Sequence, residues 1–419
     1  MKTFLEIDTK NFNNSLVIID VDGTIVPDKC KSISSERINK IKELAERNKV
    51  YLCSNGSPEN AKIFAGLANV SAVSVKKPFY GKVPKINNFT KTIVLGDKYL
   101  TDGLFAKFIG AEFLKIKHVC SPNDSFFTKL SYAFDDLIWV ILPYFQLIRP
   151  WQWIKNLLVF APVFFVGGIL NGVLLANTFI AFIAFCLASG GVYAFNDIFD
   201  EDQDRLHPKK TQRPIASGRV SRKGAYWFIG ILAILIAVLF CFFPVLILPV
   251  GFYIILNGAY SIWLKHIAVV DILCVSVFYL LRIFAGSVAI SVSPSPWLLL
   301  CVLFGSLFVI IGKRRAEYRH DVRRAVLEQY SREALDFMLG ISTALAIIAY
   351  GIWSVIGHDS PYLVYSTIFV IFVLFRMLNR IYTHPHEAES PELLVFKDRW
   401  IFASFLFWVI YVFFVFYTL

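Results

Sequence analysis

Cysteines are few in this sequence, and no segment has the features of a cleavable leader. The seven cysteines lie far apart and include no C-x-x-C pair, so neither a disulfide framework nor a zinc site is expected. Residues 1–8 contain no apolar stretch followed by a small-residue cleavage site. We therefore expect no signal peptide and a first domain that stays in the cytoplasm.

Apolar residues are abundant and unevenly distributed. Of the 419 residues, 56% are hydrophobic and 16% aromatic, and the mean hydropathy is +0.58. One globular core cannot hide that much apolar side chain from water. Charges and short apolar runs alternate at first, whereas runs long enough to cross a membrane begin near Leu137. The sequence thus predicts a small soluble domain followed by a membrane domain.

Nine apolar runs of roughly twenty residues predict nine transmembrane helices. They cover about 153–170, 174–195, 225–243, 245–263, 268–290, 296–312, 335–356, 361–382 and 400–418. Lys and Arg gather in alternate loops, at 205–223, 265, 313–324 and 397–399. Because such residues mark the cytoplasmic side, we expect the polar motifs in the cytoplasm and the C-terminus outside. The net charge of +11 therefore favours anionic lipids and phosphorylated substrates over nucleic acid.

A shorter apolar segment, Leu137–Ile148, precedes the first of these runs. Its twelve residues include Pro143 and are too few to cross a bilayer. We expect it to lie at the membrane interface and to lead into Trp151 and Trp153, whose side chains suit the headgroup level.

An acidic run follows the second predicted span directly. Over 196–204 it has the pattern N-D-x-x-D-x-x-x-D, and a continued helix would align Asn196, Asp200 and Asp204, with Asp197 beside them. Like charges on one helix face are unfavourable unless a cation lies there, and these oxygen ligands suit Mg²⁺. Four basic residues follow that would hold the diphosphate of a substrate: Arg205, Lys209, Lys210 and Arg213. The alternative is a solvated acidic loop.

This acidic pattern, followed by Arg213-Pro214-Ile215-Ala216-Ser217-Gly218, resembles the first signature of the UbiA prenyltransferase superfamily. The resemblance covers residues 149–419. It implies an all-α membrane fold of nine helices that binds a Mg²⁺-diphosphate on the cytoplasmic side.

The second signature of the aromatic prenyltransferases in this superfamily, a D-x-x-x-D pair after the fourth span, is incomplete here. The corresponding stretch, 260–275, has the single carboxylate Asp271. The runs 149–156, 264–266 and 312–317 look instead like the decaprenyl-phosphate phosphoribosyltransferase branch. That resemblance implies that a polyprenyl phosphate attacks the anomeric carbon of phosphoribosyl diphosphate while Mg²⁺-bound pyrophosphate departs.

Two anionic substrates in one cavity require several positive charges. The candidate substrate-binding residues of the membrane domain are Lys155, Asn196, Arg205, Lys209, Arg213, Tyr260, Lys265, Arg282, Lys313 and Arg314. Arg282 is a strong candidate because it lies inside the fifth span, where an unpaired charge is costly. The other basic residues are also compatible with the positive bias of cytoplasmic loops.

Polar residues follow three apolar strands in the first domain. The predicted buried strand at 15–19 ends in Asp20-Val21-Asp22-Gly23-Thr24. A carboxylate at the tip of a strand, with another two residues later, suits phosphoryl transfer, in which Asp20 attacks and Asp22 protonates the leaving oxygen. Later strands lead to Ser54 and to Asp97, which is followed by Asp102, and Lys77 stands between them.

These motifs, in this order, resemble the haloacid dehalogenase superfamily over residues 10–118, and most closely its phosphatidylglycerophosphatase branch. The resemblance implies a small α/β Rossmann-like domain in which Ser54 and Lys77 hold the transferred phosphate. It also implies a Mg²⁺ site made by Asp20, Asp97 and the carbonyl of Asp22, with Asp102 in support.

The sequence therefore predicts a phosphatase-like domain over 1–118, a linker with an interfacial segment over 119–148 and a membrane transferase domain over 149–419. We expect an enzyme of the bacterial inner membrane that makes a polyprenyl-phosphoryl-ribose 5-phosphate, and whose N-terminal domain dephosphorylates that product or a related lipid. One alternative is a prenyltransferase that uses a prenyl diphosphate and an aromatic or glycerol-type acceptor. Another is a transporter or lipid-binding protein with a regulatory soluble domain, although carboxylates clustered at the end of a span weigh against transport.

Overall fold

The computed structural model of the chain describes two compact units, residues 1–143 and 144–419. The described residues are 1–28, 30–78, 80–81, 89–122, 124–206, 210–318, 325–357, 360–388 and 391–417. The boundary between the units falls inside the segment 119–148, which the sequence predicts as a linker.

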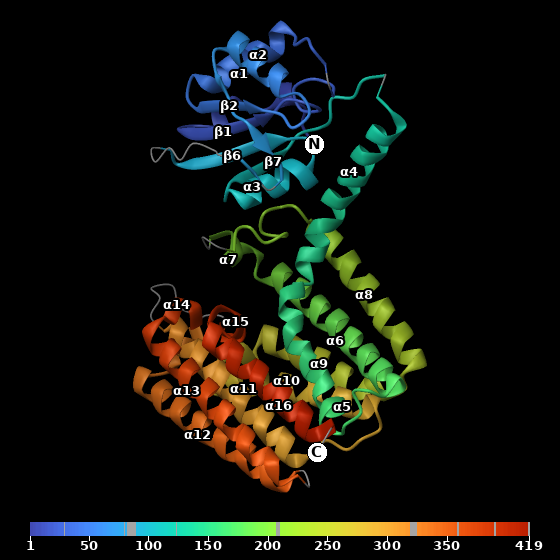
Figure 1. The fold of residues 1–419 in the computed structure, drawn as a ribbon, viewed down its shortest axis with the longest axis vertical. Coiled ribbons are helices and arrows are strands. Elements are labelled where there is room, and N and C mark those ends of the chain that lie inside the picture. Colours follow the sequence, from blue (N-terminus) through green and yellow to red (C-terminus); the bar gives the residue numbers. More distant parts are fainter. Residues whose placement is uncertain are drawn as a thin grey trace. The chain divides into compact units, whose positions relative to one another are not determined.

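The N-terminal unit is built on a parallel sheet of five strands in the order β3-β2-β1-β6-β7. These strands are β1 (Ser15–Asp20), β2 (Lys49–Cys53), β3 (Ser71–Ala72), β6 (Lys91–Gly96) and β7 (Glu112–Lys115). The central strands are apolar and buried because helices cover both faces. Helices α1 (Ser35–Ala45) and α2 (Pro58–Ala68) lie on one face, and α3 (Leu104–Phe108) lies on the other (Figure 1).

The register of the sheet brings three strand ends together. Asp20 of β1 pairs with Cys53 of β2, and Ile19 pairs with Leu95 of β6. Because the strands are parallel, the residues that follow them emerge at one edge. A small antiparallel ribbon, β4 (Val75–Lys76) and β5 (Tyr80–Gly81), carries Lys77 between its strands.

Helix α4 (Phe126–Leu147) extends the interfacial segment expected at Leu137–Ile148 toward the N-terminus. The first part of α4 belongs to the N-terminal unit, where Tyr132 and Asp135 are buried. The other faces of α4 carry large apolar side chains that are exposed, namely Phe126, Phe127, Leu130, Phe134, Leu137, Val140, Ile141 and Phe145. The helix therefore turns polar groups toward the sheet and apolar groups outward, the reverse of an ordinary amphipathic helix.

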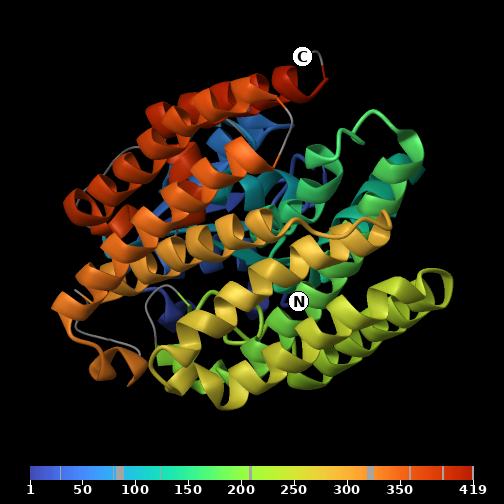
Figure 2. The same cartoon turned by 90° about the horizontal axis from the view of Figure 1, so that it is seen from below.

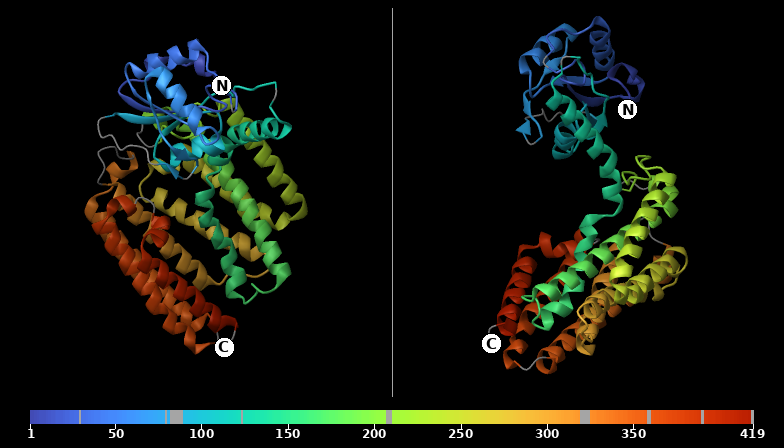
Figure 3. Two further views of the ribbon diagram at one scale, coloured as in Figure 1. Left: turned by 45° about the horizontal axis from the view of Figure 1, so that its top comes forward. Right: turned by 90° about the vertical axis from the view of Figure 1, so that its right-hand side faces the viewer.

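The C-terminal unit is an all-α bundle (Figure 2). In the described ranges, eight helical segments are long and apolar enough to cross a membrane. They are α6 (Gly172–Phe199), α8 (Arg222–Phe242), Pro244–Ile262 with α9 (Ile247–Ile262), α10 (Val270–Ala289), α11 (Pro296–Glu317), α12 (Arg332–Ile356), Pro361–Thr383 with α13 (Thr367–Thr383), and α16 (Arg399–Tyr417). Helix α6 packs against α8, α9 and α10, and α11 packs against α12 (Figure 3).

The first of the nine predicted spans, at about 153–170, has a different form from the one expected. A 3₁₀-helix, Pro150–Phe160, is followed by the short helix α5 (Ala161–Phe165), and the chain then turns. The predicted span thus consists of two helical segments of different type, which apolar composition does not distinguish. A 3₁₀-helix rises about 2.0 Å per residue, so these two segments together still extend roughly 30 Å.

Asp398 joins the last helix to α13. Its side chain is 1% exposed and accepts hydrogen bonds from Arg376 Nε at 3.1 Å and from Arg380 Nε at 2.8 Å. It also accepts from the backbone N–H of Trp400 at 2.9 Å, in the first turn of α16. Burial alone would raise the pKa of Asp398, but these donors outweigh it and hold the pKa well below its usual value.

We expect Asp398→Ala to lower the free energy of unfolding by about 2–4 kcal/mol, because it removes the buried carboxylate that Arg376 and Arg380 share and also removes a helix cap. Thermal unfolding of the detergent-solubilised protein measures the effect. Glu387→Gln is a suitable control, since that carboxylate is 39% exposed and lies 3.8 Å from Arg380. Equal stability of the two variants would contradict this account of Asp398.

Candidate functional site

Three buried carboxylates meet at the edge of the N-terminal sheet. Asp20, Asp97 and Asp102 have oxygens within 4.8 Å of one another, and in the described part of the chain no other three acidic, histidine or cysteine side chains gather this closely. The ammonium of Lys77 lies 2.5 Å from Asp20 and also contacts Asp102. One positive charge against three carboxylates leaves a negative excess. This donor set therefore fits a divalent cation such as Mg²⁺.

Burial and mutual repulsion shift the ionisation of this cluster. Burial, and then the charge of Asp102, raises the pKa of Asp20 well above its usual value. Burial also raises the pKa of Asp102. For Lys77, burial opposes the charged form, but the two carboxylates outweigh it and raise the pKa well above the usual value. The cluster thus carries an electrostatic cost that a bound cation would relieve.

The loop after β1 completes this site. Ser54 donates a hydrogen bond to Asp22, and the hydroxyl of Thr24 donates to Asp97 Oδ1 at 3.1 Å. Gly23 has a φ of +77°, and a Cβ at this position would lie 2.3 Å from Asp97 Oδ2, so only glycine fits. The structure therefore brings together all six residues that the sequence assigns to this domain: Asp20, Asp22, Ser54, Lys77, Asp97 and Asp102.

His118 adjoins the same site, although no sequence motif predicts a role for it. Its Nδ1 lies 3.0 Å from Asp97 Oδ2, and its Nε2 lies 3.1 Å from Asp136 Oδ1. Burial would lower the pKa of His118, but the hydrogen bond to Asp97 and both carboxylate charges outweigh it and raise the pKa. The sequence gives no indication of this role, because the partner Asp136 lies in the segment predicted as a linker.

In the C-terminal unit, the acidic run continues the helical path of α6 into α7 (Glu201–Leu206). The amide of Asp200 donates to the carbonyl of Asn196 at 2.9 Å, and the amide of Asp204 donates to the carbonyl of Asp200 at 2.8 Å. The helical hydrogen-bond pattern, in which each amide donates to the carbonyl four residues earlier, thus continues from α6 into α7. Asn196, Asp200 and Asp204 therefore lie on the same face of the helix.

Arginines link the carboxylates of this run. Arg213 Nη1 lies 3.1 Å from Asp197 and 2.5 Å from Asp204, and Arg149 also contacts Asp197. Both aspartates are 2% exposed, whereas the side chains of Arg149 and Arg213 are 19% and 26% exposed. Solvent therefore reaches the arginines but hardly reaches the carboxylates. An anionic substrate approaching from solvent would meet guanidinium groups first.

Further cations surround these residues. Lys210 lies 3.8 Å from Asp204, and Lys265 lies 3.4 Å from Asp200. The buried Oδ1 of Asn196 has no hydrogen-bond partner in the structure. An unpaired oxygen beside two aspartates fits a cation ligand, because a buried acceptor without a partner is costly.

Other predicted substrate-binding residues are placed differently. Arg205 pairs with Glu201 at 2.5 Å, away from Asp197 and Asp204. Lys155 and Lys313 are half-buried. Lys209 lies outside the described residues.

Arg282 is 3% exposed, and its Nε and Nη1 both donate hydrogen bonds within the bundle. Its Nε donates to Asn156 Oδ1 at 2.8 Å, and its guanidinium carbon lies 5.1 Å from the ring centre of Tyr253. Asn156 and an aromatic ring thus stabilise this charge within the bundle.

The lone carboxylate of the second predicted motif, Asp271, is fully buried and doubly engaged. Arg314 Nε donates to Asp271 Oδ2 at 2.8 Å, and the Tyr330 hydroxyl donates to Asp271 Oδ1 at 2.7 Å. Arg314 also contacts Glu317 at 3.0 Å and the hydroxyl of Tyr260 at 3.4 Å. Asp271 therefore serves as an anchor for Arg314, and Tyr330 is a partner that sequence motifs do not reveal.

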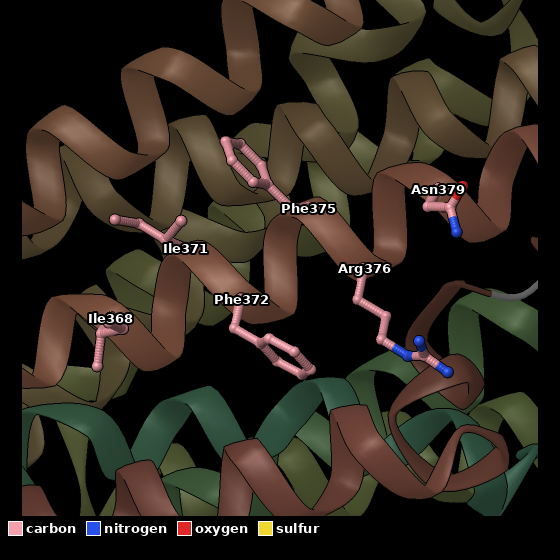
Figure 4. Close-up of a pocket in the computed structure, with 6 residues that line it drawn as sticks. All are labelled: Ile368, Ile371, Phe372, Phe375, Arg376 and Asn379. Carbon is pink, nitrogen blue, oxygen red and sulfur yellow. The ribbon is translucent and has the colours of Figure 1, made fainter.

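A shallow, open cavity of about 450 Å³ lies along α13 (Figure 4), and no residue proposed as catalytic lines it. Its lining consists of Ile368, Ile371, Phe372, Phe375, Arg376 and Asn379. These side chains include no carboxylate and no nucleophile, and Arg376 already pairs with Asp398. The cavity therefore offers apolar surface and no chemistry.

Comparison with known proteins agrees with the arrangement of the C-terminal unit. The sequence model of the UbiA prenyltransferase family matches residues 157–406. The decaprenyl-phosphate phosphoribosyltransferase of Mycolicibacterium smegmatis is 35% identical over 286 residues, which cover 62% of this chain and 88% of that protein. The enzyme of the same name from Mycobacterium tuberculosis is 36% identical over 278 residues, covering 62% of this chain and 90% of that protein.

A solved structure has the same fold. A UbiA homologue from Archaeoglobus fulgidus, bound to GPP and Mg²⁺, superposes with a TM-score of 0.52 at 18% identity. The match covers 65% of this chain and 99% of that one. The all-helical membrane fold expected from the sequence is therefore confirmed for this part of the chain.

Proposed function

Because this chain belongs to the UbiA prenyltransferase family, we propose that its C-terminal unit transfers the 5-phosphoribosyl group from phosphoribosyl diphosphate to a polyprenyl phosphate in the presence of Mg²⁺. The observation that carries the proposal is the cluster of Asp197, Asp204, Arg149 and Arg213 at the end of α6. The names of the mycobacterial relatives support the same reaction.

In the proposed reaction, a phosphate oxygen of the lipid bonds to the anomeric carbon of the ribose while the bond from that carbon to pyrophosphate breaks. The electron pair of the broken bond leaves with pyrophosphate, so no protein nucleophile is required. Bound Mg²⁺ would stabilise the negative charge on the departing oxygens. Asn196, Asp197 and Asp200 would hold the cation, and Arg149 and Arg213 would bind the phosphate oxygens and orient the donor.

The environment of Asp271 supports a donor other than a prenyl diphosphate. Aromatic prenyltransferases of the family have two carboxylates in the second acidic signature. This chain has only Asp271 there, and Arg314 and Tyr330 hydrogen-bond to both of its oxygens. Arg314 is thereby fixed beside Tyr260, and the carboxylates of Asp271 and Glu317 balance its charge. With its one carboxylate engaged by protein donors, the stretch 260–275 has no further acidic side chain to bind a second cation.

We also propose that the acidic motif faces the cytoplasm of a bacterial inner membrane. The protein is an integral membrane protein, and its basic residues gather in the loops between α6 and α8, α9 and α10, α11 and α12, and α13 and α16. Basic residues in alternate short loops support a cytoplasmic position for all four loops.

For the N-terminal unit we propose a Mg²⁺-dependent phosphatase of the haloacid dehalogenase type. Asp20 would attack the phosphorus as the bond to the leaving oxygen breaks, and Asp22 would protonate that oxygen. Water would then hydrolyse the aspartyl phosphate and restore Asp20, with Ser54 and Lys77 holding the phosphate. The proposed substrate is the 5-phosphate of the transferase product or of a related lipid.

The lipid product tests the transferase proposal. We expect purified protein with Mg²⁺, polyprenyl phosphate and phosphoribosyl diphosphate to yield a lipid heavier by a phosphoribosyl group, or by a ribosyl group after dephosphorylation. Geranyl diphosphate should yield no such product. Mass spectrometry of the extracted lipid distinguishes these outcomes. Transfer from geranyl diphosphate to an aromatic or glycerol-type acceptor, with none from phosphoribosyl diphosphate, would instead identify an ordinary prenyltransferase.

A further inference from the structure

The inner face of α4 packs against the N-terminal acidic site. Tyr132, Asp135, Asp136 and Trp139 are spaced at i, i+3, i+4 and i+7, so they share one face of the helix. The ring of Tyr132 lies 4.2 Å from that of His118, and the ring of Trp139 lies 5.7 Å from that of Phe113. Tyr132 and Asp135 are 4% and 1% exposed.

The first link from α4 to the site runs through His118. Its two ring nitrogens contact Asp97 at 3.0 Å and Asp136 at 3.1 Å. Thr24 donates to the other oxygen of Asp97 at 3.1 Å. Both oxygens of Asp97 are therefore held by protein donors, which fixes the plane of the carboxylate that faces Asp20 and Asp102.

The second link runs through Asp135. Its carboxylate accepts hydrogen bonds from the backbone N–H of Tyr99 at 2.9 Å and of Leu100 at 2.8 Å, and it also pairs with Lys115. The short π-helical turn Tyr99–Gly103 begins at these amides and carries Asp102. Asp135 thus fixes the start of the turn whose fourth residue enters the acidic cluster.

From these contacts we propose that α4 is a positioning element of the N-terminal site, in which His118, backed by Asp136, orients Asp97 toward the cation and Asp135 holds the turn that carries Asp102. This inference rests on the proposed phosphatase function. The geometry is that of an outer layer of hydrogen bonds around metal ligands, which orients the ligands without touching the substrate. Asp136 itself is 37% exposed, and an ion pair so exposed contributes little to stability. Its contact with His118 therefore acts mainly on orientation, and it also lies 2.9 Å from the buried ammonium of Lys115.

The test uses full-length protein in detergent, with p-nitrophenyl phosphate as the substrate and Mn²⁺ as a spectroscopic probe. We expect His118→Ala and Asp136→Asn to raise the Mg²⁺ concentration for half-maximal hydrolysis by about 10- to 100-fold, because lost outer contacts weaken metal binding by that much. Maximal hydrolysis at saturating Mg²⁺ should fall far less. His118→Gln, which keeps one N–H donor for Asp97, should restore part of the Mg²⁺ affinity.

Mn²⁺ binding, followed by electron paramagnetic resonance, reports on the site without turnover. The component that disappears in Asp20→Asn identifies the N-terminal site, and its affinity should fall in His118→Ala and Asp136→Asn as the Mg²⁺ dependence does. Asp8→Asn, at an exposed position remote from the cluster in the fold, is the matched control and should behave as wild type.

Two results would overturn the inference. One is wild-type Mg²⁺ dependence and Mn²⁺ affinity in both His118→Ala and Asp136→Asn. The other is a loss of maximal hydrolysis in every His118 and Asp136 variant with unchanged Mg²⁺ dependence, which indicates a merely structural role. If wild-type protein neither binds Mn²⁺ at this site nor hydrolyses the ester, the proposed phosphatase function fails, and the inference fails with it.

Discussion

Asp197→Asn is expected to lower the rate of lipid transfer by roughly a thousandfold, because the loss of a cation ligand removes several kcal/mol of charge stabilisation and each 1.4 kcal/mol is a factor of ten. The same change removes the carboxylate charge that orients Arg149, whereas Arg213 keeps its contact with Asp204. Transfer of label from phosphoribosyl diphosphate to extracted lipid, measured over a range of Mg²⁺ concentrations, gives the rate.

Asp202→Asn is the matched control for this experiment. Asp202 lies in the same acidic run, but its side chain is 87% exposed and its contact with Arg222 is 3.8 Å long. It should retain near-wild-type transfer. If Asp197→Asn also transfers normally at limiting Mg²⁺, the acidic run does not hold the cation, and the solvated-loop interpretation gains support.

Asp20→Asn is expected to abolish phosphate release, with a loss of at least about a thousandfold, since an amide cannot form the aspartyl phosphate. Lipid transfer should continue at its normal rate, because Asp20 and Asp197 belong to different units. With phosphoribosyl diphosphate as donor, the intact protein should accumulate polyprenyl-phosphoryl-ribose, and Asp20→Asn should accumulate the 5-phosphate form. Inorganic phosphate, assayed separately from pyrophosphate, reports the second step.

A shared chain gives a reason for coupling the two steps. Tethering raises the effective concentration of a phosphatase over a product made by the same molecule, and no channel is needed. Should the intact protein accumulate only the 5-phosphate form with Mg²⁺ saturating, the coupled-step proposal is wrong. A different phospholipid would then be the better candidate substrate, and hydrolysis of such lipids by wild type but not by Asp20→Asn would identify it.

Features that depend on neighbouring residues could be predicted from the sequence. The lengths of the apolar runs predict the strand that ends at Asp20 and eight of the nine membrane spans. A buried strand needs a short continuous run of apolar residues and a membrane helix needs a long one, and both are visible in the local sequence. The 3₁₀ form of Pro150–Phe160 could not be predicted in this way. Apolar composition is the same for both helical types, and tertiary packing decides between them.

Features that depend on distant partners could not be predicted. Arg282 in a span indicates a costly charge, but the sequence does not reveal that Asn156, 126 positions earlier, accepts its hydrogen bond. Asp271 likewise depends on Tyr330, 59 positions away. Asp135 falls in the segment 119–148, which the sequence predicts as a linker, whereas in the structure Lys115 holds that carboxylate inside the fold.

The position of α4 in the chain also bears on how the protein is made. The side chains that surround the N-terminal acidic cluster all lie before Pro143, and the first helical segment that lies wholly in the C-terminal unit begins at Pro150. Because domains fold as units while synthesis proceeds from the N-terminus, the residues that complete the soluble unit leave the ribosome before that helix does. The order of the sequence therefore lets the N-terminal unit complete its fold before most of the bundle has been synthesised.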